Sequence, residues 1–129
     1  MIFGIGQDLC DSKRIEATLE KHGDRFKNRI YTKNEIKKCD SRKNYVDSYA
    51  RRFAAKEACS KALGTGFKRG VFYKDIEVVN LKSGKPTIIL KGGALEQFKL
   101  ITKNDESAKI EVSLTDDNKL AMAIVIISN

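Results

Sequence analysis

Histidine and cysteine are scarce in this chain: His22 is the only histidine, and Cys10, Cys39 and Cys59 are the only cysteines. The three cysteines are widely spaced and form no Cys-x-x-Cys pair. A structural zinc site needs four clustered cysteine or histidine ligands, so the sequence excludes a zinc-stabilised domain. We expect three reduced, partly buried thiols.

Proline and long apolar runs are also scarce. Pro86 is the single proline, and no repeat or linker rich in proline, glycine or serine interrupts the chain, so we expect one domain over residues 1–129. The longest apolar run, residues 120–127, is too short to span a bilayer, and the first residues lack a signal-peptide pattern. These absences predict a cytoplasmic protein without a membrane segment.

Positive charge is what the chain has in excess. It contains 25 lysine and arginine residues against 17 aspartate and glutamate residues, a formal net charge of +8. Such a field attracts nucleic acid, anionic membranes, phosphorylated small molecules or acidic proteins. Basic residues concentrate near the N-terminus, where they form either a solvated face or a recognition face for an acidic helical partner. They are Lys13, Arg14, Lys21, Arg25, Lys27 and Arg29.

Hydrophobic periodicity predicts an α+β fold. After a short apolar strand at residues 2–6, helical patterns occupy residues 12–22, 24–29, 32–39, 45–63 and 94–101. Period-two patterns with turn residues predict two hairpins, with strands at 75–81 and 87–91, then 109–114 and 120–127, turned at 83–85 and 116–118. We therefore expect an N-terminal strand and helices followed by antiparallel β-hairpins.

Two carboxylates occur on otherwise apolar elements. Asp8 follows a strand containing Gly4 and Gly6, which indicate close backbone approach or special backbone dihedrals. Glu57 continues a helix row that is aromatic in the preceding turns. A helix cap explains Asp8 or Asp11, and an exposed ion pair with Lys61 explains Glu57. Alternatively, the pair forms a site for Mg²⁺, which uses one or two carboxylates together with phosphate oxygens and water.

A basic, glycine-rich loop at residues 64–70 follows the longest predicted helix. It is not a Walker loop, because its glycines come after a helix, whose C-terminus carries partial negative charge. Phosphate binding here requires Lys61, Lys68 and Arg69 together with a metal ion. Alternatively, Gly64 is a helix C-cap followed by a solvated basic turn.

The segment at residues 52–66 reads RFAAKEACSKALGTG and is the most specific block in the chain. Shorter blocks surround it in order: GIGQDL at 4–9, FKNRIYT at 26–32, DIEV at 75–78, GKP at 84–86 and SLT at 113–115. This ordered set resembles the motifs of the holo-acyl-carrier-protein synthases, a family of small 4′-phosphopantetheinyl transferases. The resemblance covers nearly the whole chain.

The resemblance implies a magnesium-dependent enzyme of fatty acid biosynthesis. Such an enzyme transfers the 4′-phosphopantetheine moiety of coenzyme A, its co-substrate, to a serine of apo acyl carrier protein and releases adenosine 3′,5′-bisphosphate. The family also implies a homotrimer with active sites at the subunit interfaces.

Residue roles follow from the same resemblance. Asp8 and Glu57 are the implied catalytic residues and magnesium ligands. The implied coenzyme-binding residues are Arg52, Lys61, Gly64, Thr65, Gly66, Gly84, Lys85 and Pro86. The implied docking residues for the carrier protein are Lys13, Arg14, Lys21 and Arg25.

The general base stays open between Glu57 and a metal-bound water. Asp116 departs from the family, which often has histidine there, and a carboxylate repels phosphate unless it is turned away.

Two other functions remain open on the residues alone. A basic module that binds RNA or DNA predicts phosphate contacts spread over a broad face, but the aromatic residues fall largely on helical core positions. An adaptor for acidic helices leaves Asp8 and Glu57 unexplained. We therefore predict an enzyme that does not bind nucleic acid.

Overall fold

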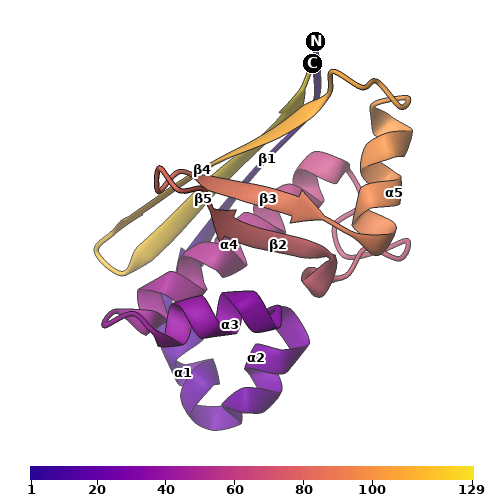
Figure 1. Cartoon of the computed structure of the whole chain (residues 1–129). Helices are drawn as coiled ribbons and strands as arrows, with labels where there is room; N and C mark the ends of the chain where they lie inside the picture. The colour runs from indigo at the N-terminus through magenta and orange to yellow at the C-terminus, as the bar shows by residue number, and fades with distance from the viewer.

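A computed structural model describes residues 1–129, with a three-stranded antiparallel sheet, a two-stranded antiparallel ribbon and five α-helices (Figure 1). The helices are α1 (Ser12–His22), α2 (Asp24–Ile30), α3 (Lys33–Asp40), α4 (Tyr45–Leu63) and α5 (Gly92–Ile101), with a 3₁₀ turn, η1 (Tyr73–Asp75). The strands are β1 (Ile2–Asp11), β2 (Ile76–Asn80), β3 (Pro86–Leu90), β4 (Lys109–Asp117) and β5 (Leu120–Ser128). The predicted α+β class, with both hairpins, is confirmed.

The three-stranded sheet has the order β1-β5-β4, so the first and last strands of the chain are neighbours. In Figure 1 the two termini lie together, and the Asn129 amide donates to the Met1 carbonyl over 3.0 Å. The register pairs Gly6 with Val125 and Asp8 with Ala123. Alternate residues of β5 are buried on the face that packs against α4.

Helix α4 is the central element of the fold and contacts β1, β5, α1, α3 and β2. It contains no glycine or proline, and small residues such as Ala54, Ala58 and Ala62 are buried along it. The predicted end at Gly64 is confirmed, because this residue caps the helix with φ +84°. No helix of the structure combines the length and apolar character required to cross a membrane.

Strand β1 lies unusually close to α4. A Cβ atom added to Gly4 would lie 2.0 Å from the Ala62 carbonyl oxygen, and one added to Gly6 would lie 1.8 Å from that of Ala58. Only glycine allows this separation, so the predicted close backbone approach is confirmed. The consequence for the site is that β1 carries Asp8 directly alongside the helix that carries Glu57.

Two sequence-based boundaries were wrong. Strand β1 continues to Asp11, which pairs with Leu120, so Asp8 lies within the strand and only Asp11 caps α1, by accepting from the Lys13 amide over 2.9 Å. The last hairpin turns at Asn118 and Lys119 instead of residues 116–118, with φ of +52° and +63°. The cause is strand pairing, which extends the ladder further than local turn propensity predicts. The other boundaries agree within two residues.

Candidate active site

A cavity of about 370 Å³, which we call the carboxylate cavity, opens between β1, α1, α2 and α4. Asp8 and Glu57 both line it, so the structure brings together the two predicted metal ligands. Arg14 from α1 adds a positive charge, while Phe26 and Phe53 form part of an apolar wall. With Asp11, three acidic groups and one basic group thus line the same space from three different elements.

Asp8 is paired with a lysine from α4. Its Oδ1 lies 3.1 Å from Lys61 Nζ, which also donates to the Gln7 carbonyl over 2.9 Å. The Asp8 side chain is 19% exposed and that of Lys61 is 52% exposed. The exposed Glu57–Lys61 pair that sequence spacing allowed is therefore absent, because Lys61 reaches across to β1 instead.

Glu57 accepts a hydrogen bond from the Tyr73 hydroxyl, whose Oη lies 2.8 Å from Glu57 Oε1. Burial, followed by this hydrogen bond, raises the pKa of Tyr73 well above its usual value, so the phenol stays protonated and donates. Tyr73 was not predicted from the sequence, because it follows Glu57 by 16 residues in a predicted loop. No spacing rule connects a helix position with a residue in a later loop.

A fully buried ion pair supports this region. Lys56 Nζ lies 2.8 Å from Glu35 Oε1, with neither side chain exposed, and it donates to the carbonyls of Tyr73 and Ile76. Glu35 also accepts from the Val78 amide over 3.0 Å. Burial lowers the pKa of Lys56, and the Glu35 carboxylate opposes this shift. The pair ties α3 and the start of β2 to α4.

Arg52 lies apart from the carboxylate cavity. It lines a separate hollow of about 200 Å³ and is almost completely buried. Its Nη1 donates to Ser48 Oγ over 2.8 Å and its Nη2 to Asn80 Oδ1 over 3.3 Å, whereas Nε has no partner. Asn80 Nδ2 donates to the Gly84 carbonyl over 3.1 Å, which connects Arg52 to the β2–β3 turn.

The remaining predicted coenzyme-binding residues fall at two places. Gly64, Thr65 and Gly66 follow α4, where the Gly66 amide donates to the Ser60 carbonyl over 3.1 Å. Lys85 and Pro86 lie at the β2–β3 turn, and Lys85 Nζ is 3.6 Å from Glu111 Oε2. The structure thus places Lys61 at Asp8 and connects Arg52 through Asn80 to the β2–β3 turn, but none of the predicted coenzyme-binding residues lines the carboxylate cavity.

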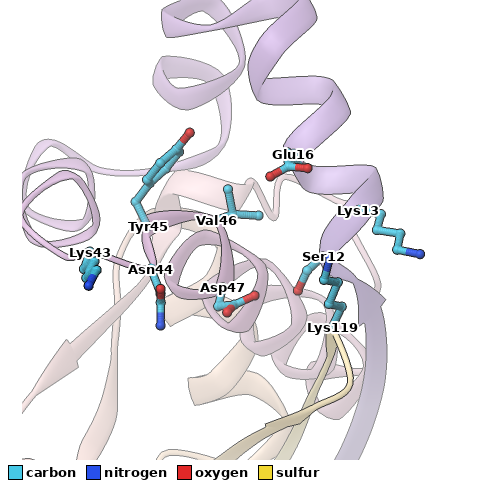
Figure 2. A pocket seen from close by; sticks show the side chains of 9 residues that line it. All are labelled: Ser12, Lys13, Glu16, Lys43, Asn44, Tyr45, Val46, Asp47 and Lys119. Carbon is cyan, nitrogen blue, oxygen red and sulfur yellow. The ribbon is translucent and has the colours of Figure 1, made fainter.

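The basic residues predicted to dock a partner are spread over α1 and α2. Arg14 lines the carboxylate cavity, whereas Lys13 lines a second cavity of about 260 Å³ at the start of α4 (Figure 2). Figure 2 shows that this second cavity carries both signs of charge, including Glu16 and Asp47. Arg25 lines a shallow hollow on α2, and Lys21 is exposed in the last turn of α1.

Asp116 is neutralised by a neighbour. Its Oδ1 lies 3.3 Å from Arg51 Nη1, an arginine of α4 that the sequence analysis did not single out. The carboxylate therefore points toward a cation. In this orientation its charge is balanced by Arg51, so it does not repel a nearby phosphate.

The carboxylate cavity fits magnesium better than a softer metal. No three histidine, cysteine, aspartate or glutamate side chains of the structure are grouped so that they could hold a metal ion together. Asp8 and Glu57 supply two hard oxygen donors, and Mg²⁺ commonly takes one or two carboxylates and completes its shell with substrate phosphates and water. Cys10 also lines the cavity, where burial and then the Asp8 charge raise the pKa of its thiol to about 11.

The chain is similar to known proteins over nearly its whole length. Residues 4–125 match the family model of the 4′-phosphopantetheinyl transferase superfamily. The chain is 57% identical over 127 residues to the holo-(acyl-carrier-protein) synthase of Methylorubrum extorquens (strain PA1), covering 98% of this chain and 93% of the relative. It is 55% identical over 128 residues to that of Parvibaculum lavamentivorans (strain DS-1), covering 99% and 96%.

Solved structures show the same fold. The holo-(acyl-carrier-protein) synthase of Neisseria meningitidis superposes with a TM-score of 0.87 and 32% identity over the whole of both chains. That of Bacillus anthracis, solved with coenzyme A (3′,5′-ADP), gives 0.78 and 36% over 98% of this chain and 96% of that one. That of Helicobacter pylori, solved with coenzyme A, gives 0.81 and 29% over 96% and 99%. This chain therefore belongs to the 4′-phosphopantetheinyl transferase superfamily and is an enzyme of its holo-(acyl-carrier-protein) synthase group.

Proposed function

We propose that residues 1–129 form one catalytic unit that transfers the 4′-phosphopantetheine moiety of coenzyme A to a serine of apo acyl carrier protein in a magnesium-dependent reaction. The reaction releases adenosine 3′,5′-bisphosphate and serves cytoplasmic fatty acid biosynthesis. The observation that carries the proposal is the presence of Asp8 and Glu57 in one cavity beside Arg14. The Helicobacter pylori and Bacillus anthracis relatives, both solved with coenzyme A, support the choice of co-substrate.

In this proposal Asp8 and Glu57 hold Mg²⁺ through their carboxylate oxygens. Bound magnesium supplies charge neutralisation for the pyrophosphate of coenzyme A and for the departing bisphosphate. Lys61 is anchored at Asp8 yet half-exposed, so its ammonium can also contact a phosphate oxygen. The serine oxygen of the carrier protein forms the new bond to phosphorus as the bond to the bisphosphate breaks. Gly64, Thr65 and Gly66, at the end of the helix that carries Lys61, bind the phosphates from the loop side.

The second group of residues completes the site from a neighbouring subunit. Arg52 lines a separate hollow and is connected through Asn80 to Gly84 at the β2–β3 turn, and none of Arg52, Gly84, Lys85 and Pro86 lines the cavity of Asp8 and Glu57. A homotrimer with interfacial sites brings the two groups together. The unpartnered Arg52 Nε is a buried donor that a coenzyme phosphate would satisfy.

The sheet offers a surface for this assembly. Its face away from α4 carries exposed apolar side chains of β1 and β5, which antiparallel sheets usually replace with polar residues on a solvated face. They include Ile5 at 62%, Leu9 at 57%, Leu120 at 42% and Ile124 at 37% exposure. We propose that copies of this chain cover the face in the trimer.

Carrier-protein docking uses the basic side of α1 and α2. Arg14 lies at the carboxylate cavity, and Lys13, Lys21 and Arg25 extend the positive surface away from it. The net charge of +8 steers anionic partners toward the protein, so this face mainly accelerates productive encounter.

The direct test is intact-mass spectrometry of apo acyl carrier protein incubated with the enzyme, coenzyme A and Mg²⁺. We expect a mass gain of one phosphopantetheine arm that disappears when a chelator is added. Glu57→Gln should lose the activity while retaining the fold, because the amide keeps the shape but removes a metal-binding charge. Glu96→Gln is the matched control, since Glu96 is exposed on α5. Normal turnover by Glu57→Gln would rule out Glu57 as a metal ligand.

A further inference from the structure

We propose that Tyr73 is a positioning residue for this reaction: its hydroxyl holds the Glu57 carboxylate in the orientation that binds the metal. The inference rests on the proposed function, because it takes Glu57 as a magnesium ligand. The hydroxyl donates to Glu57 Oε1 over 2.8 Å and makes no other hydrogen bond. Glu57 Oε2 accepts no hydrogen bond from the protein, so it is the oxygen left for the metal.

The Tyr73 ring is fixed by stacking on two other aromatic rings. Its centroid lies 3.7 Å from that of Phe67, with an interplanar angle of 18°, and 5.7 Å from that of Phe53, at 22°. Phe53 belongs to α4 one turn before Glu57, and Phe67 belongs to the loop that follows Gly66. The tyrosine therefore connects the glycine-rich loop with the helix face that carries the metal ligand.

The backbone of Tyr73 is fixed by the residue next to Glu57. Lys56 Nζ donates to the Tyr73 carbonyl over 2.9 Å, and its own position is set by the buried ion pair with Glu35. One helix thus supplies both the carboxylate and the anchor of the tyrosine that orients it. Three contacts of Tyr73 thus hold η1 in place relative to Glu57: the stacking of its ring, the hydrogen bond of its hydroxyl and the hydrogen bond to its carbonyl.

Loss of the hydroxyl should weaken metal binding without removing a metal ligand. A freed Glu57 carboxylate can adopt other rotamers, and Lys61 one turn later is a cation with which it can pair. Groups that orient metal ligands typically account for about 10- to 100-fold in metal affinity or activity. Because Tyr73 is one neutral hydrogen-bond donor, we expect the lower end of this range.

The test is Tyr73→Phe, which retains the ring and its stacking and removes only the hydroxyl. Binding of Mn²⁺, a spectroscopic substitute for Mg²⁺, is measured directly by electron paramagnetic resonance on the full chain with coenzyme A present. We expect an apparent Kd about tenfold higher than for the wild type. The Mg²⁺ concentration for half-maximal activity should rise equally, while kcat at saturating Mg²⁺ stays near the wild-type value.

Tyr49→Phe is the matched control, because the Tyr49 hydroxyl also donates to a carboxylate, at 2.7 Å from Asp40 Oδ1, but outside the carboxylate cavity. It should bind Mn²⁺ as the wild type does. Unchanged Mn²⁺ affinity in Tyr73→Phe would refute the positioning role, as would equal weakening in both variants. A lower kcat with unchanged metal dependence would instead place Tyr73 in the chemical step and also refute the proposal. Absence of Mn²⁺ binding in the wild type would contradict the magnesium site itself, a result distinct from failure of Tyr73 alone.

Discussion

The contact between β1 and α4 leads to a prediction for Gly6→Ala in which two physical effects have opposite signs. Gly6 does not have a positive φ, so alanine is permitted by the backbone there. Replacement of glycine by alanine at such a position stabilises a protein by about 0.4–1 kcal/mol, because the unfolded chain loses conformational freedom. If the contact with α4 were loose, Gly6→Ala would therefore raise the melting temperature.

The structure predicts the opposite result. The new Cβ would lie 1.8 Å from the Ala58 carbonyl oxygen and 2.8 Å from the Ala62 amide nitrogen, both backbone atoms that cannot rotate away. Relief requires β1 to move from α4 by roughly 1 Å, against the packing of a whole strand. Overpacking of this kind costs about 1–3 kcal/mol and occasionally more. At so short a contact we expect a cost of about 3 kcal/mol, and subtracting the gain of up to about 1 kcal/mol leaves a net loss of about 2 kcal/mol. For a domain of this size that lowers Tm by roughly 7 °C.

Thermal unfolding followed by circular dichroism measures this shift, with Glu96→Ala as the control. Glu96 is exposed on α5, and its truncation adds no atoms between β1 and α4, so Tm should change by less than about 2 °C. Because Asp8 lies two residues beyond Gly6, the same variant should also bind Mn²⁺ more weakly. A Tm for Gly6→Ala equal to or above that of the wild type would refute the close approach of β1 and α4.

Three further predictions concern the partner face, the assembly and the thiols. Arg14→Glu should raise KM for the carrier protein at least tenfold and leave coenzyme A binding, measured by calorimetry, unchanged, because its charge faces the acidic partner; equal loss of both would contradict the docking assignment. Ile124→Asp places a charge on the apolar outer face of β5 and should convert the oligomer to monomers in analytical ultracentrifugation, whereas an intact trimer would exclude this face as the interface. Burial raises the pKa of Cys59 from 9.0 to about 12, so the native thiol should resist iodoacetamide at pH 8 until denaturant is added. Since its pKa is higher in the folded state, this thiol contributes stability below pH 9 that is lost as the pH rises toward 12, and urea titrations at pH 8 and pH 11 measure the difference.

The local features of this protein were predictable from its sequence. The absence of glycine and proline between Tyr45 and Leu63, followed by Gly64, defines α4, because helix propensity and capping act over a few neighbouring residues. The family was also predictable, since the block at 52–66 combines a helix with the loop after it in a residue pattern that is specific to the family. The functional roles of Asp8 and Glu57 remain predictions, although the structure places both in one cavity.

The partners of these residues were decided only by the tertiary structure. Helical spacing predicted an ion pair between Lys61 and Glu57. In the fold Lys61 Nζ instead lies 3.1 Å from Oδ1 of Asp8, which is 53 residues away in the sequence. Tyr73 contacts Glu57 because η1 packs on α4, and Lys56 is buried because Glu35 on another helix neutralises it. Such contacts depend on how separate elements pack, whereas sequence periodicity reports only the face that a residue occupies on its own element.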